Sequence, residues 1–168
     1  MKITTWNING IRAIHKKGFF EYIEREQPDV LCVQETKAEM EQISPDLRAP
    51  AGYEAFYHSC SVKKGYSGVA TFTKIKPEAT FKSIGIEKFD GEGRVMATDF
   101  GEFILFNVYF PNGGMNEGRL QYKLDFYDAF FAFCEQLRKK GRKLVICGDY
   151  NTAHFAIDLA RPKENVLT

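Results

Sequence analysis

The segment Leu144-Val145-Ile146-Cys147-Gly148-Asp149-Tyr150-Asn151 passes from a short apolar run directly into a Gly-Asp turn. A continuous apolar run that ends at a turn is typical of a buried strand. We therefore predict a strand over Lys143–Cys147, with Asp149 and Asn151 in the loop that follows it.

Outward from this segment, strand-like and helical segments alternate along the chain. Directly upstream, a helix is predicted from apolar residues at helical spacing, namely Leu120, Leu124, Tyr127, Phe131 and Cys134. Another helix is predicted from about Gly18 to Glu26, and strands over Lys2–Trp6, Val30–Gln34, Tyr53–His58, Gly68–Thr73, Arg94–Asp99 and Glu102–Phe110. The sequence Thr98-Asp99-Phe100-Gly101-Glu102 is typical of a hairpin turn, so part of the sheet should be antiparallel. The predicted fold class is α/β, with a mixed β-sheet and flanking helices.

The predicted helix over residues 119–140 also carries a second apolar row, formed by Phe126, Phe130, Phe133 and Leu137. A surface helix normally has one apolar stripe and one polar face. Two rows indicate that this helix is covered on more than one side.

The composition is that of a soluble globular domain, with 44% hydrophobic and 27% charged residues. A length of 168 residues predicts a single domain over 1–168. No apolar run approaches the roughly 20 residues that a membrane helix needs, and the chain begins on a strand-like pattern without a signal sequence. We therefore expect no membrane association and a cytoplasmic location. The cysteines Cys32, Cys60, Cys134 and Cys147 have no metal-binding spacing and are predicted to be reduced and mostly buried.

Four predicted strands end at oxygen-bearing side chains. These side chains are Asn7, Glu35, Asn112, and the pair Asp149 and Asn151. Each alone is a common turn or capping residue, but in α/β sheets the ends of strands are where functional sites collect. Carboxylate and amide oxygens select Mg²⁺, Mn²⁺ or Ca²⁺ over zinc. One or two carboxylates suit Mg²⁺ when a substrate phosphate supplies further ligands. The pattern therefore predicts metal-dependent phosphoester chemistry.

Six short motifs carry a specific resemblance. They are Trp6-Asn7-Ile8-Asn9-Gly10-Ile11-Arg12, Gln34-Glu35-Thr36-Lys37, Gly65-Tyr66-Ser67-Gly68-Val69-Ala70, Asn107-Val108-Tyr109-Phe110-Pro111-Asn112, Gly148-Asp149-Tyr150-Asn151 and Ile157-Asp158-Leu159-Ala160-Arg161-Pro162-Lys163. In order and spacing the chain resembles the exonuclease III family of abasic-site endonucleases, within the endonuclease/exonuclease/phosphatase superfamily. The resemblance implies a DNA-repair phosphodiesterase that acts at abasic sites and 3′ ends, with Mg²⁺ or Mn²⁺ as cofactor.

The resemblance also implies roles for single residues. Glu35 would be the principal metal ligand, with Asn7 beside it; Asp149 would orient or deprotonate the attacking water and Asn151 would hold it, both near the metal. Tyr109 would place its hydroxyl near the scissile phosphate. The residues that would contact DNA are Arg12, Lys16, Asn112 and Arg119. For Lys16 and Arg119, a solvated basic face is nearly as good an interpretation.

The family fold implied by the resemblance is a four-layer α/β sandwich, of which this chain is expected to be the first part. The resemblance implies that a second metal-binding Asp, a His, the Asp that supports this His, and the abasic-site pocket complete the site in the family. All four are expected to be absent here, so the chain alone should turn over little or no DNA. We also expect the inner face of its sheet layer to be uncovered. A homo-oligomer, or a complex with a complementary C-terminal fragment, would then cover that face, and in a homo-oligomer the second apolar row of the helix over residues 119–140 is expected at or near the contact. Two alternatives stay open: a half-fold that binds DNA without catalysis, and another phosphodiesterase of the superfamily.

Overall fold

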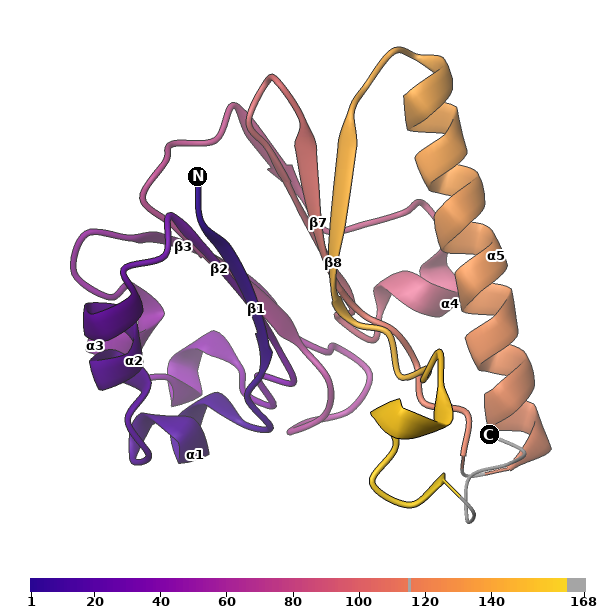
Figure 1. The fold of residues 1–168 in the computed structure, drawn as a ribbon, viewed down its shortest axis with the longest axis horizontal. Coiled ribbons are helices and arrows are strands. Elements are labelled where there is room, and N and C mark those ends of the chain that lie inside the picture. Colours follow the sequence, from indigo (N-terminus) through magenta and orange to yellow (C-terminus); the bar gives the residue numbers. More distant parts are fainter. Residues whose placement is uncertain (115, 163–168) are drawn as a thin grey trace.

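Two four-stranded sheets form the centre of the protein in a computed structural model, which describes residues 1–114 and 116–162 (Figure 1). The first sheet has the strand order β1 (Ile3–Asn7), β2 (Val30–Gln34), β4 (Val69–Thr73), β3 (Glu54–His58). The second sheet has the order β5 (Ala79–Phe81), β6 (Val95–Asp99), β7 (Ile104–Tyr109), β8 (Leu144–Asp149). The pairs β1–β2 and β7–β8 are parallel, and the other pairs are antiparallel.

Helices cover the outer face of each sheet, which gives four layers (Figure 1). The first sheet is covered by α1 (Ile11–His15), α2 (Phe19–Glu26) and α3 (Pro45–Arg48), and the second by α4 (Glu87–Asp90) and α5 (Glu117–Lys139). Short 3₁₀ turns lie at Met40–Gln42 and Ala156–Asp158. The predicted α/β class with mixed sheets is confirmed. Among the residues described, no helix has the length and apolar character to cross a membrane.

The predicted strands and the two longer helices are all present, with bounds that differ by a residue or two. The sequence did not reveal β5, α1, α3 or α4, because a strand of three residues and helices of four or five residues are too short to show their period. The four cysteines are free thiols; Cys32, Cys60 and Cys134 are buried and Cys147 is half-buried.

The inner face of the first sheet is covered by the second sheet, so our expectation of an exposed layer was wrong. β2 lies against β7 and β8, and β1 lies against β8. Val30, Cys32 and Leu105 are fully buried in this interior. Gln34 Nε2 also donates to Asn107 Oδ1 at 2.8 Å across the two sheets. Residues 79–149 supply the second sheet themselves, so this interior needs no partner.

The long helix α5 packs on the second sheet with the row that we had assigned to self-association. Phe126 and Phe130 on that row are fully buried against Phe106 and Phe110 of the sheet. The residues that remain exposed belong to the other row, namely Leu120, Leu124 and Phe131. That assignment is corrected, since both rows are apolar and the sequence does not say which one faces the sheet.

Candidate active site

The strand ends that carry the predicted site meet at one end of the molecule. β1 and β2 run parallel with Asn7 opposite Gln34, and β7 and β8 run parallel with Tyr109 opposite Asp149. Asn7 at the end of β1 also contacts Asp149 at the end of β8, so the carboxyl ends of all four strands lie at the same end of the molecule (Figure 1). Glu35 follows β2 directly, so both sheets deliver polar side chains to the same place.

An amide between two carboxylates forms the centre of this site. Asn7 Nδ2 donates to Glu35 Oε1 at 2.9 Å and to Asp149 Oδ2 at 2.7 Å. Asn7 Oδ1 accepts from the backbone N–H of Asn9 at 3.0 Å, which fixes the amide. Asn7 and Asp149, which lie 142 residues apart in the sequence, are thus joined directly, and the carboxylates of Glu35 and Asp149 both face the Asn7 amide.

Charge around Glu35 keeps this carboxylate ionised. Burial raises its pKa, but hydrogen bonds from Asn7, Lys37 and Tyr109 outweigh burial, and the pKa of Glu35 lies below its usual value. The Lys37 ammonium lies 2.5 Å from Glu35 Oε2. In Tyr109, burial and the neighbouring Glu35 raise the pKa well above the ordinary value for a phenol. Tyr109 therefore stays protonated and can donate a hydrogen bond.

Backbone strain concentrates in the loops around these side chains. Positive φ angles occur at Glu35 (58°), Lys37 (50°), Ser67 (48°) and Asn151 (51°). Residues other than glycine rarely adopt such angles unless the surrounding structure holds them there, and they cluster at functional sites. Here the loop that contains Glu35 and Lys37 is bonded to the loop that contains Ser67, because the Lys37 N–H donates to Ser67 O at 2.9 Å.

A cavity of about 990 Å³ opens beside the two carboxylates. Its lining includes Glu35, Tyr109, Asp149, Asn151, Asn112 and Arg119. The Asn151 N–H donates to Asp149 Oδ1 at 2.9 Å, and Asn151 Nδ2 donates to Phe110 O at 2.9 Å. Lys123 of α5 fixes the same loop by donating to Asn151 O at 2.6 Å. The residues predicted to be catalytic, Tyr109, Asp149 and Asn151, thus border one space with the predicted metal ligand Glu35, whereas Asn7 is not part of the lining.

The four residues predicted to contact DNA are divided between two places. Asn112 and Arg119 line the cavity. Arg12 and Lys16 are exposed on and just after α1, outside the cavity lining. Arg119 does not lie on a solvated basic face, because its guanidinium is ion-paired with Glu92 and its side chain is only 20% exposed.

The donor set suits a hard divalent cation that shares its coordination with substrate. Among residues 1–114 and 116–162, no three His, Cys, Asp or Glu side chains gather closely enough to hold a metal by themselves. The carboxylates of Glu35 and Asp149 both accept hydrogen bonds from Asn7 Nδ2, so a cation at that position would contact both of them. Mg²⁺ is typically held by one or two carboxylates, waters and substrate phosphate. The residues present therefore fit the predicted Mg²⁺ or Mn²⁺.

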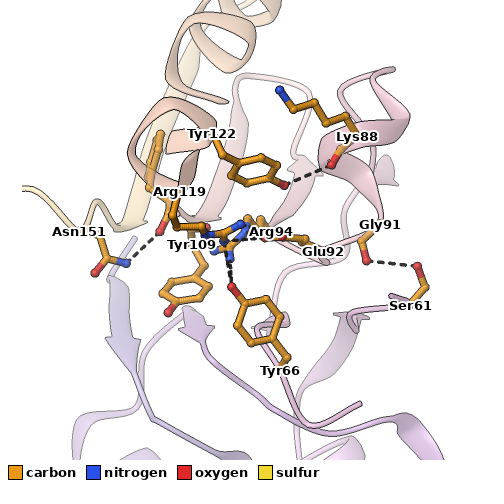
Figure 2. A network of polar contacts seen from close by, with 11 residues as sticks. Ser61, Tyr66, Lys88, Gly91, Glu92, Arg94, Tyr109, Arg119, Tyr122 and Asn151 are labelled. Atoms are coloured by element: carbon orange, nitrogen blue, oxygen red, sulfur yellow. Dashed lines mark hydrogen bonds and ion pairs between the residues drawn. The ribbon is translucent and has the colours of Figure 1, made fainter. Parts of the chain in front are cut away.

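A polar network on the cavity wall was missed by the sequence reasoning (Figure 2). Arg94, whose side chain is 1% exposed, and Arg119 both pair with Glu92. Both guanidinium groups also donate to Tyr66 Oη, each at 2.9 Å. Its members come from three separate segments, at Tyr66, at Glu92 and Arg94, and at Arg119, so no local pattern could have indicated the whole network. Lys37 was also missed, although it lies in the quoted Gln34–Lys37 motif.

Comparison with known proteins agrees with this geometry. The model of the Endonuclease/Exonuclease/phosphatase family matches residues 4–167. A DNA-(apurinic or apyrimidinic site) endonuclease of Dictyostelium discoideum is 44% identical over 98% of this chain and 45% of its own length. An exodeoxyribonuclease of Bacillus subtilis is 39% identical over 98% of this chain and 64% of its own length.

Solved structures show the same fold. A 3′-5′ exonuclease from Neisseria meningitidis superimposes with a TM-score of 0.83 at 27% identity, covering 98% of this chain and 63% of that one. An AP endonuclease from Archaeoglobus fulgidus gives a TM-score of 0.82 at 28% identity, with 98% and 62% covered. The chain thus spans 45% to 64% of the length of these four proteins.

Proposed function

Since the chain belongs to the endonuclease/exonuclease/phosphatase family, we propose that it carries the metal-binding part of a site that hydrolyses DNA phosphodiesters at abasic sites and 3′ ends. The observation that supports this most directly is the convergence of Glu35 and Asp149 on Asn7 at the common end of both sheets. The relatives named as abasic-site endonuclease and exodeoxyribonuclease give the substrate class.

The proposed cofactor is Mg²⁺, or Mn²⁺ in its place, held by Glu35 and Asp149 with Asn7 and Asn151 close by. Asn7 would have to turn its amide, because its oxygen now accepts from Asn9. A divalent metal here would polarise a phosphoryl oxygen and stabilise the departing oxygen.

The protein groups then divide the remaining work. Tyr109 donates a hydrogen bond to the phosphate without adding negative charge, since its pKa is raised by burial and by Glu35. Asp149 accepts a proton or a hydrogen bond from the attacking water. Asn151 is fixed next to Asp149 by backbone contacts and can orient the same water.

For double-stranded DNA we propose two contact regions. Asn112 and Arg119 lie at the cavity, and Arg12 and Lys16 lie on exposed surface beyond it. The α1 helix that begins before Arg12 is tied to the site, since the Ile11 N–H donates to Thr36 O at 3.0 Å. Phosphate contacts of this kind position a duplex without reading its sequence.

A homo-oligomer or a complex with a complementary C-terminal fragment remains a proposal, on a changed basis. The interior between the sheets is already covered, so no partner is needed there. The remaining basis is that β1 and β8 each lie at an edge of a sheet and next to each other.

Calorimetric titration with Mn²⁺ tests the metal assignment. We expect Glu35→Ala to abolish measurable binding, whereas Glu24→Ala, the same change at an exposed position on α2, should leave it unchanged. Unchanged Mn²⁺ binding in Glu35→Ala would refute the assignment.

A gel shift and a nicking assay on duplex with one abasic site, with and without Mg²⁺, test the substrate. We expect little or no nicking from the chain alone. Metal-dependent nicking that appears when the separately made C-terminal half is added, and that Asp149→Asn abolishes, supports the proposal. Salt-sensitive binding without nicking even in the presence of that half would instead favour the non-catalytic half-fold.

A further inference from the structure

We propose that Arg94 is a positioning residue for Tyr109, which holds the ring and backbone of that tyrosine in place through a buried fork of hydrogen bonds. The inference rests on the proposed function, in which the Tyr109 hydroxyl acts at the phosphate. Arg94 itself would touch neither the metal nor the reacting atoms.

The guanidinium of Arg94 reaches three acceptors on three different segments (Figure 2). Its Nε donates to Glu92 Oε2 at 2.5 Å, its Nη1 to the Tyr109 carbonyl at 3.0 Å, and its Nη2 to Tyr66 Oη at 2.9 Å. The guanidinium carbon also lies 4.8 Å from the centroid of the Tyr109 ring. The Tyr109 N–H donates to the Arg94 carbonyl at 2.9 Å. Tyr109 is therefore held at its N–H, its carbonyl and its ring by one residue.

The burial of the Arg94–Glu92 ion pair indicates that its role is more than to stabilise the fold. The Arg94 side chain is 1% exposed, and the Glu92 side chain that pairs with it is 14% exposed. Removing two charges from water costs about as much as their attraction returns, and apolar residues of the same volume often stabilise a protein as well. A buried pair that also fixes a side chain at the site is better explained by the geometry that it imposes.

Glu92 connects this fork to the start of α5. It accepts from Arg119 Nη1 and Nη2, both at 3.0 Å, in the bidentate arrangement that planar guanidinium groups favour. Arg119 also donates to Tyr66 Oη. The Glu92 carboxylate and the Tyr66 hydroxyl thus hold both guanidinium groups in place. Arg94, held in this way, in turn fixes Tyr109.

A lysine in place of Arg94 is the sharpest perturbation. It keeps the positive charge but has a single nitrogen on a flexible stem, which cannot reproduce the planar fork. If charge alone mattered, Arg94→Lys would leave Tyr109 unaffected. If the fork positions Tyr109, the same change would release it.

The experiment uses the 168-residue chain with 3-fluorotyrosine at all tyrosines, observed by ¹⁹F NMR without metal or DNA. Tyr109→Phe identifies the Tyr109 resonance. We expect Arg94→Lys to shift and broaden that resonance while the resonances of Tyr53 and Tyr57, in the core of the first sheet, stay in place. Arg138→Lys, at an ion pair with Glu135 on the solvent side of α5, is the matched control and should change nothing.

An unchanged Tyr109 resonance in a folded Arg94→Lys protein overturns the proposal. Should that variant fail to fold, Tyr66→Phe decides, because it removes only the hydroxyl that accepts from both arginines. We expect it to move the Tyr109 resonance in the same direction but less, and no movement would overturn the proposal. Neither measurement depends on metal or DNA. If Glu35→Ala bound Mn²⁺ unchanged, the metal assignment in the proposed function would be refuted, and that result would be separate from the test of Arg94.

Discussion

Replacing Asn7 with Asp tests the electrostatic arrangement at the centre of the site. In the parent protein, Asn7 Nδ2 donates to Glu35 at 2.9 Å and to Asp149 at 2.7 Å. The Asp side chain has nearly the same shape but no donor, so three carboxylates would face one another. Without a cation they repel, and with one they form a stronger ligand set than the parent has.

The magnitude follows from the two lost bonds. A hydrogen bond to a charged group contributes about 1.5–3 kcal/mol, so the upper limit is about 3–6 kcal/mol. Asn7 and its partners are only part-buried, so solvent screens part of this repulsion, and we expect a loss of about 2–4 kcal/mol. In a chain of this size each 1 kcal/mol lowers Tm by about 2–4 °C, which gives a fall of about 5–15 °C.

Thermal unfolding followed by circular dichroism at pH 8, in EDTA and in Mn²⁺, measures both effects. Mn²⁺ at about 100 times its Kd stabilises a protein by about 2.7 kcal/mol, so it should recover much of the lost stability in Asn7→Asp. Asn116→Asp is the control, because Asn116 caps α5 and Asp caps a helix equally well. The reasoning fails if Asn7→Asp melts like the parent in EDTA, or if Mn²⁺ stabilises the parent and the variant equally.

Four further predictions concern DNA, packing and pH. Arg12→Ala should reduce the slope of the logarithm of the binding constant against the logarithm of salt concentration, for undamaged duplex DNA, by about one. An affinity of the parent protein that does not depend on salt would show that Arg12 does not contact DNA phosphate. Gly148→Ala should cost more than about 4 kcal/mol in urea unfolding, because the new Cβ would lie 1.9 Å from Val108 O at a φ of 140°. Phe110→Ala, at a fully buried ring, should cost about 3–5 kcal/mol by the same measurement, and a smaller loss would mean that the core refills. The pKa of Glu35 is lowered in the folded protein, so the ionised carboxylate contributes stability above the ordinary Glu pKa of about 4.3. This contribution is lost as the pH falls through the folded-state pKa, and Glu35→Gln should flatten the plot of unfolding free energy against pH in that range.

Much of the fold could be predicted because buried strands are nearly continuous apolar runs. Val30–Gln34 is such a run, and the structure gives β2 the same bounds. That Asn7 and Glu35 lie close together also follows from the sequence, since parallel strands in register end at the same edge of a sheet. Their contact with Asp149 does not follow, because Asp149 ends a strand of the other sheet and the contact depends on how the two sheets are stacked.

Other features lay beyond sequence reasoning for a physical reason. The two rows of α5 are both apolar, so composition could not say that Phe126 rather than Leu124 faces the sheet. Arg94 stands at the start of a strand, where an arginine is usually solvated. Its burial depends on Glu92, Tyr66 and Tyr109, which the folded chain alone brings together.

The neighbouring edges of β1 and β8 have a practical consequence for handling the protein. Within the part of the chain that the structure describes, neither strand has a partner on its outer side. Both lack the lysines and prolines with which natural proteins blunt such edges, and Val145 of β8 is 39% exposed. An edge without a partner strand acts as a template on which further strands can be added. Concentrated solutions of this chain should therefore aggregate through β-strand addition, and a lysine at Val145 should keep the protein dispersed while the site stays intact.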